Sequence, residues 1–243
     1  MKTEILYEDR EIAVVYKPAG LATQTARTGQ QDVVSELKNY LYRSGRSGGG
    51  HGSGANPYLG VIHRLDQPVE GLLVFAKNEK AAAFLSTRLQ KQEEDSFSKR
   101  YYAVLWGQPA EREGRLVNEL YRDHAGRAVI LDEASEWGKQ FGARRAILNY
   151  EILETYRELA LAEIRIETGR FHQIRAQMAH AGTPILGDRK YGNEASEEAA
   201  RRYHVRNTAL CACSLEFMHP GSKEKMCFQI KPGGEAFSFF SQL

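Results

Sequence analysis

The chain has 243 residues with a formal net charge of +2, and 42% of its residues are hydrophobic and 26% charged. This composition is ordinary for a soluble globular protein, and no apolar run approaches the roughly 20 residues that a membrane-spanning helix needs. Acidic residues close behind Met1 argue against a secretory signal, and an odd number of cysteines, three, argues against a disulfide framework. We therefore expect a cytoplasmic protein without membrane contact.

The weakly basic charge does not by itself predict nucleic-acid binding, because many nucleic-acid-binding domains are far more basic. Local clustering of arginine is the better indication. Arg144 and Arg145 are adjacent, and Arg165, Arg170 and Arg175 crowd one segment. Such clusters on one face would attract a phosphate backbone, whereas the same residues scattered over the surface would only be solvated charges.

The first part of the chain predicts two strands and a helix before a low-complexity segment. Apolar patterning indicates strands over residues 5–7 and 12–16 and a helix over residues 32–42, with Asp32 in its first turn. Residues 44–56 are rich in glycine and lack the ending of a P-loop. We expect a flexible surface insertion there, with ordering against nucleic acid as the alternative.

Asp66 lies between two short apolar runs, residues 59–62 and 72–76, and both runs predict strands. The carboxylate is therefore expected on the connection between two strands, two residues after the cationic Arg64. Two interpretations follow. Asp66 caps a turn and pairs with its neighbour, or it is held at the end of a sheet for chemistry.

The remainder of the chain contains more predicted strands than helices, without internal repeats or a regular βαβ order. Helices are predicted over residues 79–92, 173–181 and 194–202. Strands are predicted over residues 101–106, 116–120, 128–131, 146–153, 159–166, 208–215 and 226–230. This order predicts an α+β fold with a largely antiparallel mixed sheet and flanking helices, in a single domain over residues 1–243.

Three motifs, taken together, resemble the signature of the RluA-type pseudouridine synthases. They are His63-Arg64-Leu65-Asp66, Lys99-Arg100-Tyr101-Tyr102-Ala103 and His172-Gln173-Ile174-Arg175. The early run Lys17-Pro18-Ala19-Gly20 also matches the turn after the opening strand of that family. The resemblance extends in order from about residue 12 to about residue 230. It implies the pseudouridine synthase fold, here without a separate N-terminal RNA-binding module.

The resemblance implies a role for each matched residue. Asp66 is the expected nucleophile, and Arg175 is its expected ion-pair partner. Tyr101 is expected to stack on the target base and Arg64 to occupy the gap which that base leaves, while Tyr102 must point to the opposite face from Tyr101. Other matched residues are expected to contact RNA or to line the pocket: His63, Lys99, Arg170, His172 and Gln173 for RNA, and Leu65 and Ile174 for the pocket.

The implied activity is isomerisation of uridine to pseudouridine within structured RNA, with ribosomal RNA favoured over tRNA. The reaction needs no redox change or group transfer, so no cofactor is expected, and the histidines and cysteines lack the spacing of a metal site. We expect Cys211, Cys213 and Cys227 to be buried structural thiols. RNA is the expected partner, and the protein is expected to be a monomer.

Two other functions fit parts of the pattern. A non-catalytic RNA-binding protein would keep the fold, but it would be expected to lose Asp66 or Arg175, and both are present. A hydrolase with Asp66 as general base would need a water-activating partner or a metal, and the sequence indicates neither. The chain has Val69-Glu70 where the family commonly has Thr-Ser, and Gln177 where histidine is frequent. These departures leave an altered substrate open.

Overall fold

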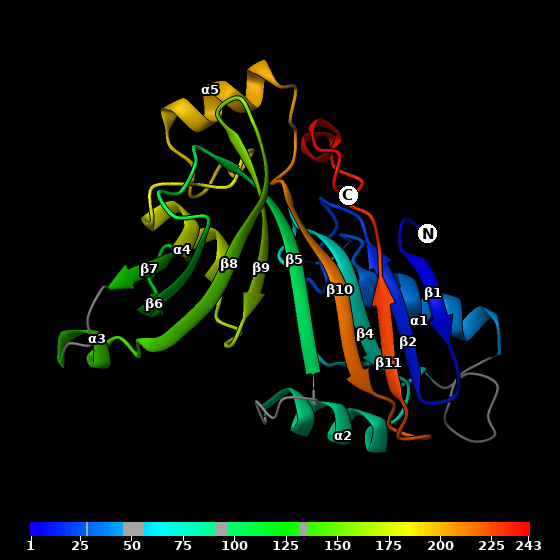
Figure 1. The fold of residues 1–243 in the computed structure, drawn as a ribbon. Coiled ribbons are helices and arrows are strands. Elements are labelled where there is room, and N and C mark those ends of the chain that lie inside the picture. Colours follow the sequence, from blue (N-terminus) through cyan, green and yellow to red (C-terminus); the bar gives the residue numbers. More distant parts are fainter. Residues whose placement is uncertain (28, 46–55, 91–96, 132–135) are drawn as a thin grey trace. The chain divides into compact units, whose positions relative to one another are not determined.

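The computed structural model describes residues 1–27, 29–45, 56–90, 97–131 and 136–243 (Figure 1). The chain forms two compact units. Unit 1 comprises Met1–Lys99 and Ala212–Ile230, and unit 2 comprises Arg100–Cys211 and Lys231–Leu243. Most of the glycine-rich segment at residues 44–56 lies outside the described residues. The expectation that residues 1–243 act as a single catalytic domain stays a prediction.

Unit 1 is built on strands in the order β1-β2-β4-β10, with β3 beside β4 and β11 beside β10. Their bounds are β1 Glu4–Glu8, β2 Ile12–Lys17, β3 Gly60–Val61, β4 Glu70–Ala76, β10 Leu210–Met218 and β11 Lys225–Gln229. The pairs β1–β2, β2–β4, β3–β4 and β10–β11 are antiparallel. Every residue of β4 is buried. This strand therefore lies at the centre of the unit, and the loop that precedes it starts from a rigid base.

Two helices belong to unit 1, α1 over Val33–Arg43 and α2 over Glu79–Gln90. Helix α1 begins after its N-cap Asp32, whose Oδ1 accepts a hydrogen bond from the Ser35 N–H at 2.7 Å. The Ser35 hydroxyl oxygen in turn accepts one from the Asp32 N–H at 3.1 Å. This reciprocal capping satisfies N–H groups that the start of a helix leaves without partners. The helix predicted over residues 32–42 is therefore present, but it starts one residue later, with Asp32 as its N-cap and not in its first turn.

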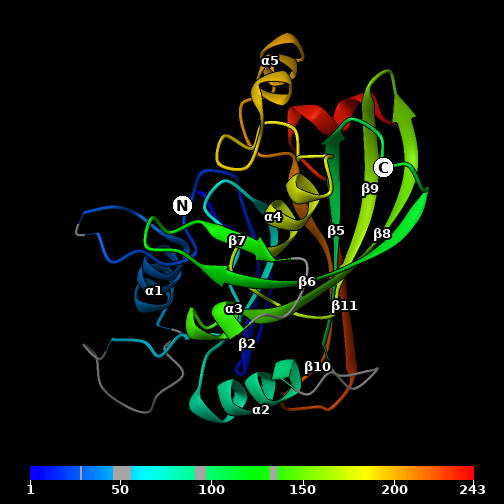
Figure 2. The ribbon, with the colours of Figure 1, turned by 90° about the vertical axis from the view of Figure 1, so that its left-hand side faces the viewer.

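Unit 2 has strands in the order β5-β9-β8-β6-β7, and each neighbouring pair is antiparallel. Their bounds are β5 Phe97–Trp106, β6 Glu113–Arg122, β7 Ala128–Leu131, β8 Arg144–Tyr156 and β9 Leu159–Ile166. The helices are α3 Glu136–Gln140, α4 Gln173–His180, α5 Glu194–Arg202 and the 3₁₀ helix η1 Glu235–Phe239. Helix α4 contacts β6 and β7 (Figure 2). A small core of Leu120, Ala128, Ala146 and Ala176 joins the helix to these strands.

The predicted α+β fold with a largely antiparallel sheet is confirmed, and every predicted strand and helix has a counterpart in the structure. Strand β7, strand β9 and helix α5 have the predicted bounds. Two helices were not predicted, α3 and η1. Each has five residues, which is too short for helical periodicity to be visible in the sequence. None of the helices described is long and apolar enough to cross a membrane.

Candidate active site

Asp66 lies on the connection between β3 and β4 in unit 1, as predicted. Its carbonyl accepts a hydrogen bond from the Val69 N–H at 3.1 Å, which closes a turn. The Asp66 side chain is half-buried, and the neighbouring Arg64 is exposed. Solvent therefore reaches both Asp66 and Arg64.

Two contacts fix the backbone on either side of Asp66. Thr23 Oγ1 accepts a hydrogen bond from the Leu65 N–H at 3.1 Å and donates one to the Leu65 carbonyl at 2.9 Å. The Gly20 N–H donates to the Gln67 carbonyl at 2.8 Å, and the Gln67 side-chain amide donates to the Gly20 carbonyl at 3.0 Å. Gly20 has a φ of +87°, a conformation that favours glycine. The turn after β2 thus holds the carboxylate-bearing loop from both sides.

Lys17, the last residue of β2, connects the same two segments and is fully buried. Its Nζ donates hydrogen bonds to three carbonyls, those of Pro18 at 3.0 Å, Leu21 at 2.7 Å and Gln67 at 3.2 Å. Burial lowers the pKa of Lys17 to about 7, while the negative charges of Asp66 and Glu70 act in the opposite direction. In the sequence, Lys17 is marked only by its place in the turn Lys17-Pro18-Ala19-Gly20. The structure shows that it brings a positive charge near Asp66.

Both departures from the family pattern have partners inside the protein. Glu70 is buried, and its Oε2 accepts a hydrogen bond from the Tyr16 hydroxyl at 2.5 Å. Gln177 is buried in α4 of unit 2, and its side-chain amide donates to Asn118 Oδ1 at 2.8 Å. These residues are therefore accommodated by the packing of each unit.

Gly71 occupies a position that no other residue fits. Its φ is +131°, and a Cβ added there would lie 2.5 Å from the backbone nitrogen of Ala212, which also belongs to unit 1. Real Cβ atoms do not approach backbone so closely, and a positive φ disfavours other residues. Strand β4 can therefore lie directly against this part of β10 only because its second residue is glycine.

His63 has an internal partner, and its contact with RNA stays a prediction. The side chain is buried, and its Nε2 accepts a hydrogen bond from the Val74 N–H at 3.3 Å. The pKa of His63 lies well below its usual value because of burial, and the charge of Lys99 acts in the same direction. A neutral imidazole buried against β4 attaches the motif to its strand. Lys99 itself is half-buried with its pKa lowered to about 8 by burial, and its RNA contact stays a prediction.

Tyr101 is buried on β5 of unit 2, opposite Ile164 on β9. Its neighbour Tyr102 lies opposite Glu163 and is half-buried. Because successive side chains of a strand point to opposite faces, these register positions confirm that the two tyrosines cannot share one role. Stacking of Tyr101 on a base stays a prediction.

Arg175 lies in α4 and is held by a carboxylate that sequence analysis missed. Its Nε donates to Asp188 Oδ2 at 2.6 Å and its Nη2 donates to Oδ1 at 2.8 Å. Both side chains are nearly fully buried, with 4% and 2% of their surfaces exposed. The Tyr191 ring lies 5.2 Å from the Arg175 guanidinium carbon. The expected partner, Asp66, belongs to unit 1, so that ion pair stays a prediction.

Tyr191 ties the loop after Asp188 to the start of α4. Its hydroxyl accepts a hydrogen bond from the Ala128 N–H at 2.7 Å and lies 2.8 Å from His172 Nδ1. His172 has a φ of +52°, and its ring stacks on Phe171 at 3.7 Å. Burial raises the pKa of Tyr191. The imidazole thus helps to orient the loop that precedes Arg175, and its contact with RNA stays a prediction.

Gln173 also has internal partners, and its contact with RNA stays a prediction. Its Oε1 accepts hydrogen bonds from the Thr168 hydroxyl and the Arg170 N–H, both at 2.9 Å, and its amide donates to the Ile147 carbonyl at 3.0 Å. Ile174 is buried beside it, as a pocket wall would be, but so is most of α4. The pocket roles of Ile174 and Leu65 and the RNA contact of Arg170 stay predictions.

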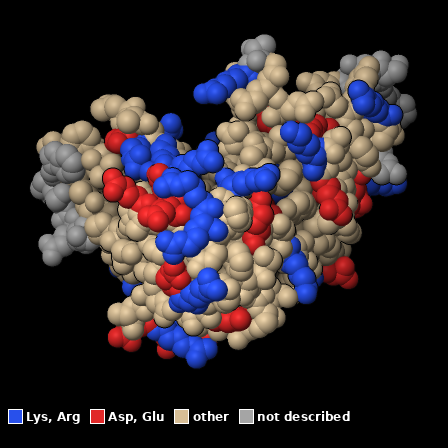
Figure 3. Space-filling view, turned by 90° about the horizontal axis from the view of Figure 1, so that it is seen from above, with Lys and Arg blue, Asp and Glu red and all other residues tan. Residues whose placement is uncertain are grey.

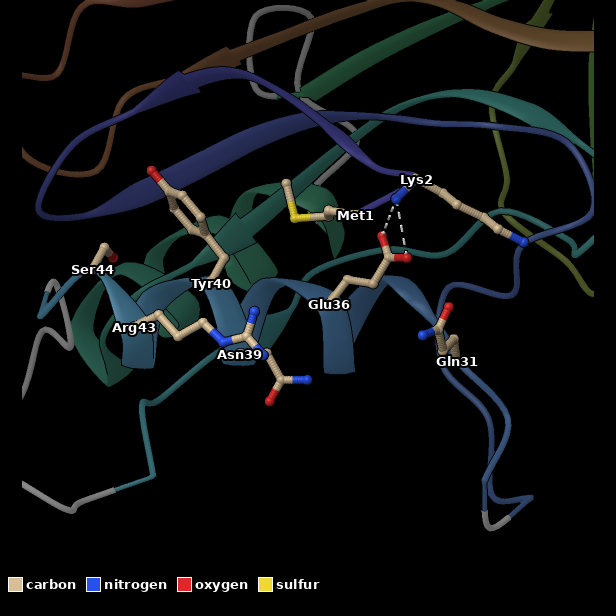
Figure 4. Close-up of a pocket in the computed structure, with 8 residues that line it drawn as sticks. All are labelled: Met1, Lys2, Gln31, Glu36, Asn39, Tyr40, Arg43 and Ser44. Carbon is tan, nitrogen blue, oxygen red and sulfur yellow. Dashed lines mark hydrogen bonds between the residues drawn. The ribbon is translucent and has the colours of Figure 1, made fainter.

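A hollow between the N-terminal residues and helix α1 is separate from the residues of the motifs (Figure 4). It is lined by Met1, Lys2, Gln31, Glu36, Asn39, Tyr40, Arg43 and Ser44. The Glu36 carboxylate accepts hydrogen bonds from the backbone N–H groups of Lys2 and Thr3, at 3.0 and 2.9 Å. Its acidic group is therefore used to attach the chain start to α1. We do not assign the active site to this hollow.

The cysteines are thiols, and Cys211 and Cys213 are buried as expected. Cys227 is exposed, which corrects the expectation for that residue, because it lies on β11 opposite Glu216, where residues alternate between exposed and half-buried positions. Among the described residues, no three His, Cys, Asp or Glu side chains are grouped so that they could hold a metal ion.

Comparisons with known proteins agree with the motifs. A profile of the family described as RNA pseudouridylate synthase matches residues 11–180. Ribosomal large subunit pseudouridine synthase D of Zymomonas mobilis is 32% identical over 230 residues, which cover 94% of this chain and 68% of the relative. The protein of that name in Xylella fastidiosa is 34% identical over 224 residues, covering 89% and 62%. The chain thus spans about two thirds of the length of these relatives.

Two solved structures share the fold. Human RNA Pseudouridylate Synthase Domain Containing 4 matches with a TM-score of 0.73 and 23% identity, over 97% of this chain and 92% of that one. Human RNA Pseudouridylate Synthase Domain Containing 1 matches with a TM-score of 0.70 and 20% identity, over 95% and 83%. At these identities the likeness concerns the fold alone. It confirms the fold that the resemblance implied.

Proposed function

This chain belongs to the RNA pseudouridylate synthase family, whose members are RNA isomerases, and from this premise we propose that it isomerises specific uridines of ribosomal RNA with Asp66 as the nucleophile. Two relatives named for the large ribosomal subunit, those of Zymomonas mobilis and Xylella fastidiosa, support ribosomal RNA as the substrate. A tRNA substrate is the alternative, and the chemistry at the uridine would be the same.

The observation that carries the proposal is the way in which Asp66 is held. Thr23 clamps the residue before it, and Gly20 clamps the residue after it. A nucleophile fixed in advance does not need to be oriented during the reaction, which lowers the entropic part of the barrier. Lys17, buried nearby with a pKa of about 7, interacts electrostatically with Asp66. A turn-capping aspartate would need neither arrangement.

The proposed reaction conserves every atom of the substrate. The bond between uracil N1 and the ribose C1′ breaks, the uracil turns, and C5 bonds to C1′ while the hydrogen on C5 leaves as a proton and N1 gains one. The carboxylate of Asp66 forms a transient covalent bond to the sugar or to the base, and either course starts from its ionised form. No oxidant, reductant or group donor is consumed.

The side chains of two arginines and one tyrosine have further roles in the proposed reaction. Arg175 pairs with Asp66 in the active complex. A guanidinium has five N–H donors in a planar fork, so it can bind more than one carboxylate, and Asp188 is one such partner here. Tyr101 stacks on the target uracil, and Arg64 occupies the gap that the flipped nucleotide leaves, as a planar guanidinium stacks well on bases.

Replacement of Asp66 by asparagine tests the nucleophile. RNA labelled with tritium at uracil C5 releases the label when pseudouridine forms, and we expect the wild type, but not Asp66→Asn, to release it. The melting temperature and the RNA affinity of the variant should stay close to those of the wild type, because the amide is nearly isosteric. Substantial release by purified Asp66→Asn would refute the assignment.

Mapping of pseudouridines in cellular RNA, with and without the gene for this chain, tests the substrate. We expect at least one site to disappear from large-subunit ribosomal RNA. Loss of a site only in tRNA would overturn the proposed substrate while leaving the chemistry intact. A wild-type protein that binds RNA but releases no tritium from either RNA would support the non-catalytic alternative instead.

A further inference from the structure

The exposed arginines of unit 2 differ in whether a carboxylate neutralises them. Arg115 lies 2.9 Å from Glu167 and Arg165 lies 2.7 Å from Glu163. Arg202 pairs with Glu158 at 2.9 Å. On the molecular face shown in Figure 3, lysine and arginine side chains likewise lie next to aspartate and glutamate side chains. Arginines with such partners give little net attraction to a polyanion, so the charge count alone does not locate an RNA-binding surface.

The hairpin of β6 and β7 carries two exposed arginines that are not paired with a carboxylate in the described part of unit 2. Arg122 ends β6, and Arg127 immediately precedes β7. Both are exposed, and within the described residues of unit 2 neither forms an ion pair with a carboxylate. Their guanidinium carbons instead lie over aromatic rings, 4.6 Å from the Phe171 centroid for Arg122 and 5.3 Å from the Tyr191 centroid for Arg127.

A guanidinium stacked on an aromatic ring is well prepared to bind phosphate. The attraction between ring and cation does not use the N–H donors of the guanidinium, as a carboxylate partner would. The stacking also restrains a long side chain, so less conformational entropy is lost when it binds an anion.

Lys190, on the loop that follows Asp188, contacts the turn between β6 and β7. It adds a third cation beside Arg122 and Arg127. Lys190 Nζ donates to the Gly126 carbonyl, and an Arg127 Nη2 donates to the Lys190 carbonyl. The Asp123 carboxylate, the acidic group of this turn, accepts a hydrogen bond from the Arg127 N–H at 2.7 Å. A Cβ added at Gly126 would lie 3.5 Å from Arg122 Nη2, which places that guanidinium at the same turn. We call Arg122, Arg127 and Lys190 the hairpin cluster.

The hairpin cluster is rigidly connected to Arg175. The Ala128 N–H, at the start of β7, donates to the Tyr191 hydroxyl, and the Tyr191 ring lies over both Arg127 and Arg175. The Tyr191 N–H also donates to Asp188 Oδ1 at 3.3 Å, and that carboxylate holds Arg175. An anion at the hairpin would therefore be bound at a fixed distance from the arginine that the resemblance places at the reaction.

We propose that the hairpin cluster is a binding site for backbone phosphates of the substrate RNA. This inference rests on the proposed function, because RNA is the polyanion which that function supplies. The site holds RNA through phosphate contacts without reading bases, so it contributes affinity and register and leaves the choice of uridine to other parts of the surface.

Replacement of Arg122 and Arg127 by glutamine, singly and together, tests the site through RNA affinity at several salt concentrations. We expect the double variant to raise the dissociation constant about tenfold at low salt. We also expect it to lower the slope of log K against log salt by about 1.5, since each lost phosphate contact removes roughly 0.7–0.9 from that slope. The probe is a fluorescent fragment of ribosomal RNA, and binding is followed by anisotropy.

Arg115→Gln combined with Arg165→Gln is the matched control. It removes the same charge from the same sheet, but from arginines that are paired with glutamates. Arg115 and Arg122 are seven positions apart on one regular strand, so their side chains lie on opposite faces. The control should leave the salt slope unchanged. Equal losses in both double variants, or an unchanged slope in the hairpin variant, would overturn the proposal.

Two further measurements separate the possible reasons for a loss. Arg122→Lys with Arg127→Lys keeps the charge, so its salt slope should stay near that of the wild type, and melting temperatures verify that all variants fold. The binding assay does not depend on turnover. A wild type that fails to isomerise uridine but shows the predicted slopes would refute the proposed function alone, whereas normal binding by the glutamine variants of an active enzyme would refute this inference alone.

Discussion

Replacing Asp188 by asparagine removes the negative charge beside Arg175 and keeps the shape of the side chain. In the wild type, two guanidinium N–H groups donate to the two carboxylate oxygens at 2.6 and 2.8 Å, and both residues are nearly fully buried. An amide offers one oxygen only. Its NH₂ group would face an N–H of the guanidinium, so one of the two hydrogen bonds is replaced by a repulsion between donors.

The expected loss of stability follows from this geometry. Removing one partner of a buried ion pair costs about 3–5 kcal/mol, because the other charge stays buried. The Tyr191 ring still faces the guanidinium and provides some attraction, so we expect the lower end, about 3 kcal/mol. For a chain of this size, that loss lowers the melting temperature by about 6–12 °C.

Urea unfolding followed by circular dichroism measures the change. Asp123→Asn is the matched control in the same unit, because Asp123 accepts a backbone hydrogen bond that an amide oxygen can also accept. We expect the control to lose less than about 1 kcal/mol. A combined Arg175→Met and Asp188→Leu variant should regain most of the stability, since two apolar side chains leave no charge buried. A loss below about 1 kcal/mol in Asp188→Asn would refute the reasoning.

Three further predictions concern the reaction, protonation and metal ions. Arg175→Ala should lower the rate of tritium release at least about a hundredfold, which is on the order of 3 kcal/mol in the barrier. Arg175→Lys should restore only part of this rate, because an ammonium lacks the planar fork of a guanidinium. A wild-type rate in Arg175→Ala would contradict the proposed role of Arg175. The pKa of Lys17, about 7 in the folded protein, lies below its usual value, so the unfolded chain binds more protons above pH 7 and the free energy of unfolding should rise with pH from about 7 to 10. Lys17→Met should flatten this rise by at most about 1.4 kcal/mol per pH unit. Urea unfolding of both proteins at pH 7, 8 and 9 measures the difference. If the free energy of unfolding changed with pH equally in the wild type and in Lys17→Met, the assigned pKa would be contradicted. Activity on folded RNA should be unchanged by EDTA, because the isomerisation needs no Lewis acid, and an EDTA loss that zinc but not magnesium reverses would count against this.

The sequence predicted the fold well because its strands are regular. Short apolar segments identified β7 and β9 with their observed bounds, and two apolar runs correctly placed Asp66 on the connection between β3 and β4. Local patterns of this kind depend on neighbouring residues, which a sequence shows directly. The capping of α1 by Asp32 was predictable for the same reason.

The contacts that hold the site were less predictable, because they depend on residues far apart in the chain. Asp188 follows Arg175 by a helix and a turn, and nothing in the spacing marks it as the partner. His63 and Gln173 were assigned to RNA from their motifs, yet both are buried with backbone partners. Burial is a property of the packed chain, so polar residues in a motif can be internal anchors as readily as ligand contacts.

Charge clustering in the sequence was also an incomplete indication of surface charge. Arg165, Arg170 and Arg175 are five positions apart, but they end in different environments. Arg165 pairs with Glu163 on a strand, Arg170 donates to the Arg145 carbonyl, and Arg175 is buried in a helix. The arginines of the hairpin cluster drew no attention in the sequence, because aromatic rings rather than neighbouring cations distinguish them.

The discontinuity of unit 1 sets an order of events during protein synthesis. Strand β4 leaves the ribosome early, whereas Ala212, which packs against Gly71, follows only after residues 100–211 of unit 2 have been made. During that interval a strand whose residues are all buried in the final fold lacks the neighbour that later covers its start, and unpaired strands rich in apolar residues readily join other chains. A nascent chain that stopped before Ala212 would contain every residue of the Asp66 loop and still leave β4 incomplete. Chaperone dependence of the nascent chain should therefore end only when β10 has been synthesised.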